Sequence, residues 1–346
     1  MSAIAVNGRF LHKARICGVE RYGREVVARL PEYVPLNVRQ PAHGALAYHH
    51  LWEQAILPSH LDKGTLLFNP CNLAPLCHPA NVITLHDAIP LAYPQFYRPA
   101  FRLYYRALIP TLARRAVHVI TVSEYSRRQI SRFTGISEKK ITVIPNGVSH
   151  RFHPALRSSD SELFARYRIG RPYILYTGSL EPRKNVVALL KAFAFAREHL
   201  GLEGYELLVA GSGHPIFASA GLGASPWPDV RFLGYVDDAD LPSLYANAEL
   251  FVYPSLCEGF GLPPLEAMAA GVVALVSQGS ALEEITIEPE LRFAAHDYHA
   301  LAEKICHILE RPSLKLAYSR KGLERARQFS WQRTAERTAQ VLAAYG

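Results

Sequence analysis

Two groups of charged residues in the second half of the sequence have the types and spacing needed to bind a phosphate-bearing substrate. Arg183 and Lys184 are adjacent cations that follow Gly178 and an apolar run, a pattern that predicts a strand-to-helix turn. Such a turn suits a diphosphate, because cations and backbone N–H groups can surround its oxygens. Glu258 and Glu266 bracket a second turn of this kind, with seven residues between them. We therefore predict a pocket for an activated substrate that carries a diphosphate.

One strand-loop-helix unit positions the two glutamates. The apolar run Leu250–Tyr253 is typical of a buried strand. Pro263 or Pro264 suits the first position of the helix that follows, and Gly271 suits its end. A glycine loop that meets a helix N-terminus is a natural anion site. The loop in question contains Gly259, Phe260 and Gly261.

Two positions in the first half could contribute to a ligand site. His86 and Asp87 follow the predicted strand Val82–Leu85. They should therefore lie at the carboxyl edge of the sheet, where open α/β sheets bind ligands. Gly18 stands where a loop enters the predicted helix Glu20–Leu30, and a glycine there lets a ligand approach the backbone. The alternatives are a loop histidine with satisfied hydrogen bonds and a simple turn at Gly18.

Short apolar strands alternate with helices along both halves of the chain, which predicts two doubly wound α/β domains. A chain of 346 residues is also long for one core. Polar, irregular sequence from 149 to 161 indicates the boundary. We expect domains at 1–158 and 159–329 and a terminal helix over 330–346. The predicted strands are Ile4–Val6, Thr65–Phe68, Val82–Leu85, Val117–Val122, Ile141–Ile144, Tyr173–Tyr176, Leu207–Ala210, Phe232–Val236, Leu250–Tyr253 and Val272–Val276.

Composition indicates a globular protein with an anionic partner. Hydrophobic residues make up 49% of the chain and the net charge is +8. The five scattered cysteines fit no metal-binding spacing and indicate reduced thiols in the cytoplasm. No signal peptide and no apolar run of about 20 residues is evident. We therefore expect a cytoplasmic protein.

The segment 98–115 is both basic and amphipathic. Arg98, Arg102 and Arg106 recur at four-residue spacing, beside an apolar stripe that includes Tyr105. Such a helix could lie on the anionic inner face of a membrane, or it could be an ordinary packed surface helix. Pro110 should kink it or divide it into two helices.

Asp238-Ala239-Asp240 has the form of a metal-binding motif. However, it directly precedes a predicted helix with Pro242 at its start, so Asp240 is better interpreted as an N-cap. We therefore predict no metal site and no required cofactor.

Several segments, in chain order, resemble motifs of the family 4 glycosyltransferases. The most specific is Glu258–Ala269, which resembles the E-x7-E motif of that family. The resemblance covers nearly the whole chain and implies the GT-B fold, in which two Rossmann-like domains face each other across a cleft. The other matching segments are Leu85–Asp87, Val122–Ser126, Pro145–Val148, Gly178–Asn185 and Phe232–Val236.

The resemblance implies transfer of a sugar from a nucleotide-sugar donor, with retention of anomeric configuration. Lys184 and Arg183 would pair with the diphosphate, and Glu266 would hydrogen-bond the ribose hydroxyls. Glu258 and the backbone of Gly259–Gly261 would hold the donor sugar and the distal phosphate. Because the two cations would stabilise the departing diphosphate, no metal is needed for this step.

The resemblance also implies contacts from other segments. His86 would reach the donor sugar from the first domain, and Gly18 would line the same cleft. Some members carry an arginine where this chain has Ser179, so that phosphate contact is either missing here or supplied by Arg183. Further residues expected at the nucleotide sugar are Gly178, Ser179, Val236 and Leu262.

The resemblance favours GDP-mannose as the donor and a saccharide or a polyprenyl-diphosphate-linked saccharide as the acceptor, in surface-polysaccharide synthesis. A UDP-sugar donor and a nucleotide-sugar epimerase are the alternatives on the same fold. A phosphorylase would need a lysine for pyridoxal phosphate, which the sequence does not identify. The +8 charge leaves a nucleic-acid-binding protein as a non-enzyme alternative. However, no recognised binding module is present, and nucleic acid is not expected as a partner.

Overall fold

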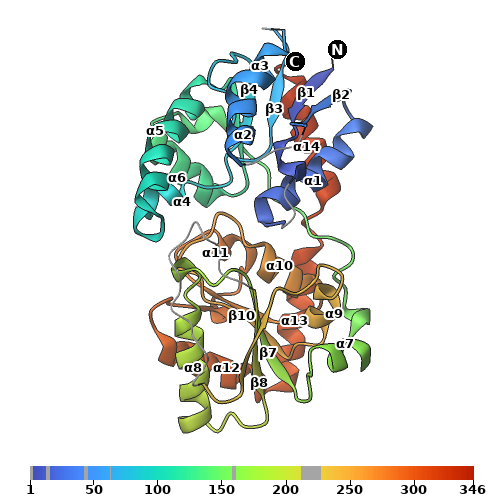
Figure 1. Cartoon of the computed structure of the whole chain (residues 1–346). Helices are drawn as coiled ribbons and strands as arrows, with labels where there is room; N and C mark the ends of the chain where they lie inside the picture. The colour runs from blue at the N-terminus through green and yellow to red at the C-terminus, as the bar shows by residue number, and fades with distance from the viewer. Residues whose placement is uncertain (1–2, 13–15, 43–45, 63, 158–160, 212–226) are drawn as a thin grey trace. The chain divides into compact units, whose positions relative to one another are not determined.

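The computed structural model describes residues 3–12, 16–42, 46–62, 64–157, 161–211 and 227–346 (Figure 1). The chain forms two compact units. The first comprises Met1–Pro94, Pro99–Gly147 and Phe329–Gly346, and the second comprises Gln95–Arg98 and Val148–Gln328. The predicted boundary at 158 and 159 lies outside the described residues.

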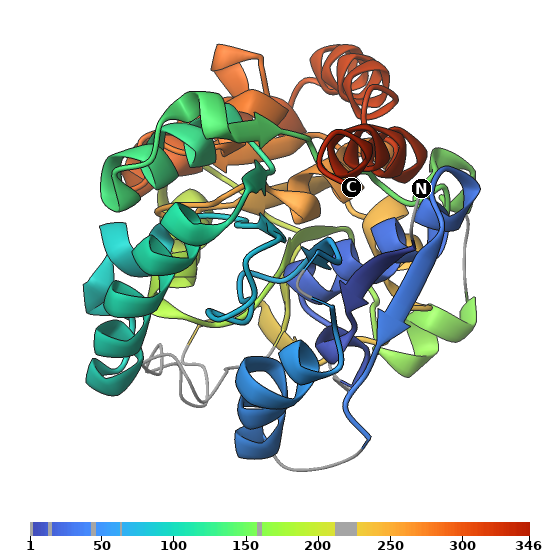
Figure 2. The same ribbon diagram turned by 90° about the horizontal axis from the view of Figure 1, so that it is seen from above.

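The first unit is built on a sheet of six parallel strands in the order β2-β1-β3-β4-β5-β6. Chain order reverses at β1, and right-handed crossovers then place helices on both faces. Figures 1 and 2 show α5 and α6 on one side of this sheet and α1 and α14 on the other. The strands are β1 (Ile4–Asn7), β2 (Leu36–Arg39), β3 (Leu67–Asn69), β4 (Asn81–Thr84), β5 (His118–Thr121) and β6 (Ile141–Val143).

The helices of the first unit bury their apolar sides on the sheet. In α6, the predicted N-cap Ser123 is confirmed, because its Oγ accepts a hydrogen bond from the backbone N of Ser126 at 3.0 Å. A π-helical segment, η3 (Trp52–Ile56), joins α2 to α3. The helices are α1 (Gly18–Arg29), α2 (Leu46–Leu51), α3 (Leu57–Ser59), α4 (Ile89–Ala92), α5 (Pro99–Arg115), α6 (Glu124–Thr134) and α14 (Trp331–Ala343).

The C-terminal helix α14 belongs to the first unit, although it follows the second unit in sequence. It packs against α1, and the side chains of Trp331 and Leu342 are buried. Thr334 Oγ1 donates to the carbonyl oxygen of Pro145 at 2.8 Å, and Arg337 Nη2 donates to that of Val143 at 2.9 Å. The helix therefore attaches to the loop after β6 as well as to α1.

The second unit has its own six-stranded parallel sheet, in the order β12-β11-β10-β7-β8-β9. Chain order runs outward from β7 to β9 and then returns to place β10 on the other side of β7. The pairs Leu250 with Ile174 and Phe251 with Leu175 set this register. The strands are β7 (Tyr173–Thr177), β8 (Glu206–Ala210), β9 (Val230–Gly234), β10 (Leu250–Tyr253), β11 (Ala274–Ser277) and β12 (Arg292–Phe293).

Helices cover the sheet of the second unit, where α8 packs against α12 and α10 against α9 and α13. The strands β7, β8, β10 and β11 are buried along their whole length. The helices are α7 (Ser161–Arg166), α8 (Val186–His199), α9 (Leu241–Ala246), α10 (Leu262–Ala269), α11 (Leu282–Ile285), α12 (Tyr298–Leu309) and α13 (Pro312–Ala326).

The structure differs from the sequence-based predictions at three elements, α5, β2 and β12. Helix α5 runs unbroken from Pro99 to Arg115, so the predicted division at Pro110 is wrong. The strands β2 and β12 were not predicted, because β2 mixes polar and apolar residues and β12 has only two residues.

Among the described residues, no helix is long and apolar enough to cross a bilayer.

Candidate functional site

The charged residues singled out in the second half meet where the strand order of the second sheet reverses. The loop after β7 contains a 3-10 turn, η7 (Pro182–Lys184), and the loop after β10 contains Glu258. Because β7 and β10 are parallel neighbours, their carboxyl ends lie side by side. This topological switch point is where open α/β sheets bind ligands.

Asn185 joins the two loops. Its backbone is left-handed, with φ of 54°, and its side-chain Nδ2 donates to the carbonyl oxygens of Pro254 and Ala295 at 3.1 and 2.7 Å. Asparagine tolerates this conformation better than most residues. Asn185 therefore ends η7, starts α8 and holds Lys184 against the loop after β10.

Lys184 forms a buried ion pair with Glu258. Its Nζ lies 2.6 Å from Glu258 Oε1 and donates to the hydroxyl of Tyr253 at 2.7 Å. Glu258 Oε1 also accepts from Ser255 Oγ at 2.6 Å. An ammonium group has three N–H donors, so in the described part of the chain one donor of Lys184 is left for a ligand.

Arg183 shares the same carboxylate. Its Nη1 lies 3.2 Å from Glu258 Oε2 and donates to the carbonyl oxygen of Cys257 at 2.8 Å. Its Nη2 lies 3.2 Å from Glu181 Oε2. The cluster thus contains two cations and two carboxylates, all buried, and it is nearly neutral as a whole.

The cations control the ionisation of Glu258. Burial would raise its pKa, but the ammonium of Lys184 and the guanidinium of Arg183 outweigh burial and lower the pKa to about 2. Glu258 is therefore a carboxylate throughout the physiological pH range. As such it can only accept hydrogen bonds, from a sugar hydroxyl or from Lys184.

Two glycines of this site have positive φ angles and lie close to neighbouring side chains. Gly261, which precedes α10, has φ of 119°, and a Cβ atom there would lie 2.7 Å from Leu282 Cδ2. Gly178 has φ of 150°, and a Cβ atom would lie 2.9 Å from the hydroxyl of Tyr176. Both positions require glycine, because a side chain would suffer strain and a close contact.

Glu266 is anchored differently from Glu258. It is the fifth residue of α10, beyond the first turn, so the helix dipole contributes little to stabilising its charge. Its Oε2 accepts from the hydroxyl of Tyr245 at 3.2 Å, and that hydroxyl is also hydrogen-bonded to Thr177 Oγ1 at the end of β7. Glu266 therefore lies at the same sheet edge as the charged cluster.

Four other predicted residues flank these loops. Ser179 follows Gly178, and its carbonyl oxygen accepts from the hydroxyl of Tyr176 at 2.9 Å. Val236, after β9, is buried, as are Phe260 and Leu262 at the start of α10. These side chains shape the edge of the sheet.

Sequence reasoning missed the partners that orient the charged residues. Glu181, Tyr253 and Ser255 contact Arg183, Lys184 or Glu258, and Tyr245 contacts Glu266. Glu181 precedes Arg183 by two residues, so it could have been predicted as a counter-ion. Ser255 lies three residues before Glu258 in the same loop. The contacts of Tyr253 and Tyr245 join distant segments and carry no local signal.

His86 and Gly18 lie in the first unit. His86 is buried, with Nε2 2.9 Å from the carbonyl oxygen of Pro70 and its ring in edge contact with Tyr22. Burial lowers its pKa to about 4, so the imidazole is neutral near pH 7. A neutral ring that donates through Nε2 presents Nδ1 as an acceptor. Gly18 is exposed at the start of α1.

In the Asp238-Ala239-Asp240 segment, the carboxylate of Asp240 is held by other side chains. Both carboxylate oxygens of Asp240 accept from Arg166 Nη1, at 2.9 and 2.8 Å, and Tyr167 donates to Oδ2 at 2.8 Å. Asp240 does occupy the N-cap position of α9, but its side chain makes no capping hydrogen bond, so this part of the interpretation is wrong. The described residues include no group of three or more potential metal ligands.

Known proteins are similar to this chain in both sequence and fold. The profile of the Glycosyl transferases group 1 matches residues 160–325, and that of Glycosyltransferase Family 4 matches residues 60–152. The O-antigen chain mannosyltransferase B of Escherichia coli is 33% identical over 272 residues, which are 76% of this chain and 69% of that protein.

Two further matches extend over more of the chain. The serotype-specific mannosyltransferase WbdA of Escherichia coli is 28% identical over 335 residues, 92% of this chain but only 39% of WbdA. The sucrose-phosphate synthase of Thermosynechococcus elongatus superposes with a TM-score of 0.74 at 20% identity, covering 99% of both chains. That structural likeness shows the GT-B fold. The chain therefore belongs to the group 1 glycosyltransferases of family 4.

Proposed function

We propose that the chain transfers mannose from GDP-mannose to a saccharide or lipid-linked saccharide in surface-polysaccharide synthesis, with retention of configuration. The buried Arg183–Lys184–Glu258 cluster at the switch point carries this proposal. The similarity to mannosyltransferases of Escherichia coli supports mannose as the transferred sugar. We assign donor binding to the second unit and acceptor binding to the first.

The cluster suits the chemistry of the donor. In the transfer, the bond between the anomeric carbon and the diphosphate oxygen breaks, and the acceptor hydroxyl oxygen bonds to that carbon. The acceptor proton passes to the departing phosphate oxygen, which leaves a nucleoside diphosphate. Lys184 and Arg183 would stabilise the charge that grows on this leaving group. This route needs no protein base.

The remaining roles follow from the hydrogen-bonding capacity of each group. Glu266 would accept hydrogen bonds from the ribose hydroxyls, and Glu258 from the donor sugar. The neutral His86 would accept a hydrogen bond from a sugar hydroxyl through Nδ1. Because the diphosphate and Glu258 compete for Lys184, donor binding should loosen the ion pair that the structure shows.

A thermal-shift screen tests the donor. The melting temperature should rise with GDP-mannose, because a ligand that binds only the folded state stabilises it. UDP-glucose, ADP-glucose and dTDP-glucose serve as matched comparisons. Stabilisation by UDP-sugars alone would overturn the mannose assignment. Conversion of the donor to an epimer without any acceptor would instead favour an epimerase.

A chelator tests the role given to the cations. Transfer activity should persist in EDTA, because Lys184 and Arg183 supply the positive charge that a metal would otherwise bring. The measurement is the initial rate with EDTA, and then with added magnesium or manganese. Complete loss in EDTA that either metal restores would contradict this mechanism.

The exposed side of α5 favours contact with an anionic membrane, as expected for a lipid-linked acceptor at the cytoplasmic face. Arg102 and Arg106 are exposed, and Leu103 between them is 73% exposed. Basic residues beside an exposed apolar side chain suit an anionic bilayer surface.

Vesicle sedimentation tests this surface. Changing Arg102 and Arg106 together to glutamate should reduce binding to phosphatidylglycerol-containing vesicles by at least about tenfold, since each basic residue contributes about 1 kcal/mol. The matched control changes the exposed Lys139 and Arg320 to glutamate. Equal binding by both variants and the unaltered chain would exclude α5 as the membrane contact.

A further inference from the structure

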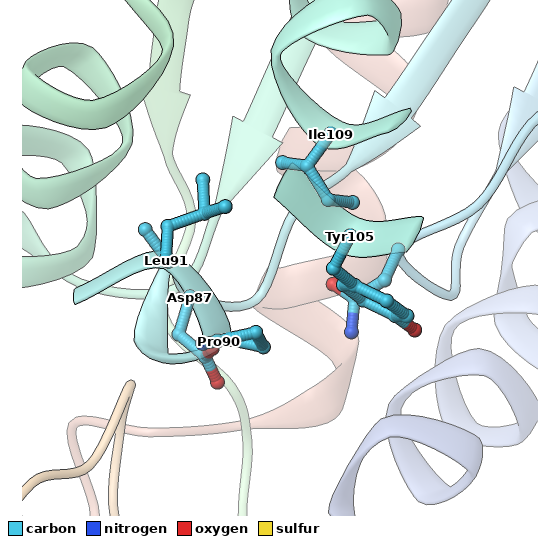
Figure 3. Close-up of a pocket in the computed structure, with 7 residues that line it drawn as sticks. Asp87, Pro90, Leu91, Tyr105 and Ile109 are labelled. Atoms are coloured by element: carbon cyan, nitrogen blue, oxygen red, sulfur yellow. The ribbon is translucent and has the colours of Figure 1, made fainter. Parts of the chain in front are cut away.

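A small hollow in the first unit has room for about one water molecule. Figure 3 shows it between Asp87 and Leu91 on one side and Tyr105 of α5 on the other. Asn72 also lines it. Its volume is about 20 Å³, which is too small for a sugar ring or a nucleotide. The side chains that say more about substrate recognition lie in the second unit, around Glu266.

A line of three side chains joins the end of β7 to α10. Thr177 is the last residue of β7, and its Oγ1 is hydrogen-bonded to the hydroxyl of Tyr245 on α9. The same hydroxyl donates to Oε2 of Glu266 on α10 at 3.2 Å. All three side chains are buried. Three separate elements of the second unit therefore meet through one tyrosine hydroxyl.

The hydrogen bonds in this line run in one direction. A tyrosine hydroxyl has a single hydrogen, and Tyr245 donates it to Glu266. Thr177 must therefore be the donor to the phenol oxygen. Hydrogen bonds that follow one another in this way polarise each other, so the hydroxyl of Thr177 strengthens the bond from Tyr245 to the carboxylate.

Packing fixes the ring of Tyr245. The ring meets Phe152 edge on, with the ring centres 5.5 Å apart, and its centre lies 5.4 Å from that of Phe251 on β10. Both phenylalanines are buried. The last torsion of a glutamate has no sharp preference, so an external partner must set the plane of its carboxylate. A tyrosine locked by packing is such a partner for Glu266.

The plane of this carboxylate matters for the role assigned to Glu266. Two neighbouring hydroxyls of a ribose can donate to the same carboxylate only if its oxygens face them. A carboxylate has about four acceptor positions, and Tyr245 takes one of them on Oε2. The tyrosine therefore directs how the carboxylate meets a ligand.

We propose that Tyr245, supported by Thr177, is a positioning residue that orients Glu266 toward the ribose hydroxyls and so makes the site selective for ribonucleotides over deoxyribonucleotides. The proposal rests on the proposed function, which assigns Glu266 to the ribose. Tyr245 acts through Glu266 and need not touch the donor. Because GDP, UDP and ADP all contain ribose, the proposal holds whichever of these nucleotides the donor carries.

The test compares a nucleoside diphosphate with its 2′,3′-dideoxy analogue, by calorimetric titration of the full chain. GDP and dideoxy-GDP form the first pair, and UDP and dideoxy-UDP the second. The unaltered chain should bind the dideoxy analogue at least about tenfold more weakly, as for loss of a hydrogen bond to a charged group. In Tyr245→Phe this ratio of Kd values should fall to about threefold or less, because binding of the ribonucleotide weakens while that of the analogue does not.

Tyr173→Phe is the matched control. The hydroxyl of Tyr173 donates to the carbonyl oxygen of Leu244 on α9 at 2.7 Å, and Tyr173 is buried. This variant therefore also removes a buried tyrosine hydroxyl that is bonded to α9, but the lost bond goes to the backbone and not to Glu266. The melting temperature should fall, while the ratio of Kd values should stay within about twofold of that of the unaltered chain.

A second pair of variants keeps the test decisive if Tyr245→Phe does not fold. Thr177→Val has a similar size but no hydroxyl, so the ratio of Kd values should fall about threefold, as for loss of a hydrogen bond between neutral groups. Thr177→Ser keeps the hydroxyl and should retain the ratio of the unaltered chain. Folding of every variant is checked by its melting temperature.

The outcomes separate a positioning role from a structural one. An unchanged ratio in the folded variants Tyr245→Phe and Thr177→Val would overturn the proposal. Equal weakening of both members of a nucleotide pair would also overturn it, and so would an equal fall of the ratio in Tyr173→Phe.

The same measurements separate this proposal from the proposed function. Sugar transfer by the unaltered chain, together with an unchanged ratio in Tyr245→Phe, would leave the proposed function standing and overturn this proposal. A ratio that falls in Tyr245→Phe but not in Tyr173→Phe would support the positioning role even if the unaltered chain transferred no mannose. An unaltered chain that binds each nucleotide and its dideoxy analogue equally would overturn both the ribose role of Glu266 and this proposal.

Discussion

Replacing Lys184 with alanine is expected to lower turnover by at least about 100-fold. In the structure, its ammonium lies 2.6 Å from Glu258 and 2.7 Å from the hydroxyl of Tyr253, at the carboxyl ends of β7 and β10. We assign it to the departing diphosphate. A preorganised donor of this kind contributes about 3–4 kcal/mol to the transition state, which sets the size of the expected loss.

Lys191→Ala is the control for this experiment. Lys191 is exposed on α8, where its Nζ lies 5.8 Å from the centre of the Tyr298 ring, and it is not part of the charged cluster. Turnover should be measured at saturating donor, together with the melting temperature of each variant. Near-normal turnover in a folded Lys184→Ala protein would remove Lys184 from the site.

Glu258→Gln is expected to lower stability at pH 7 by about 3 kcal/mol and turnover by at least about 100-fold. Glutamine resembles a protonated glutamate, and the pKa of Glu258 is depressed to about 2 from an ordinary 4.5. A depressed carboxyl pKa stabilises the fold above the unfolded value. This contribution is therefore complete above pH 4.5 and is lost as the pH falls toward 2.

Nucleotide binding distinguishes two roles of Glu258. Without its charge, Arg183 keeps its ion pair with Glu181, while Lys184 has no other carboxylate partner among the described residues. A nucleoside diphosphate should therefore bind at least as tightly as to the unaltered chain. Turnover should still fall, because the donor sugar loses its acceptor group. The measurements are denaturant unfolding, calorimetric titration with GDP and steady-state turnover.

Glu198→Gln is the matched control, because Glu198 is exposed on α8. It should change none of the three quantities appreciably. Normal turnover in Glu258→Gln would show that the carboxylate serves the fold alone. Much weaker GDP binding would contradict the competition between Glu258 and the diphosphate.

Local patterns in the sequence were sufficient for most elements of the fold. Apolar runs such as Tyr173–Tyr176 and Leu250–Tyr253 predicted strands that the structure contains as β7 and β10. The prolines at 263 and 264 and Gly271 indicated approximately where α10 begins and ends, since these residues favour particular backbone conformations. The edge strand β2 was missed because it lies partly exposed and lacks a continuous apolar run.

For the candidate site too, the sequence predicted the residues but not the contacts between them. Residue types and spacing alone predicted a site for a diphosphate-bearing substrate at Arg183, Lys184, Glu258 and Glu266. The sequence could not show that Glu258 pairs with both cations, because Lys184, for example, lies 74 residues before it in the chain. That pairing exists because β10 inserts beside β7, and strand order is a property of the whole sheet.

The sequence by itself determined which residues carry charge and where the chain turns, because helix, strand and turn preferences act over a few neighbouring residues. Only the tertiary structure decided which groups meet. It shows that Arg183 and Lys184 form a buried, nearly neutral cluster with Glu181 and Glu258. It also shows that the carboxylate of Asp240 pairs with Arg166 and does not cap helix α9. It also brought Asn72, Asp87 and Tyr105 to one hollow. Such contacts join distant segments and depend on packing, which no short stretch of sequence encodes.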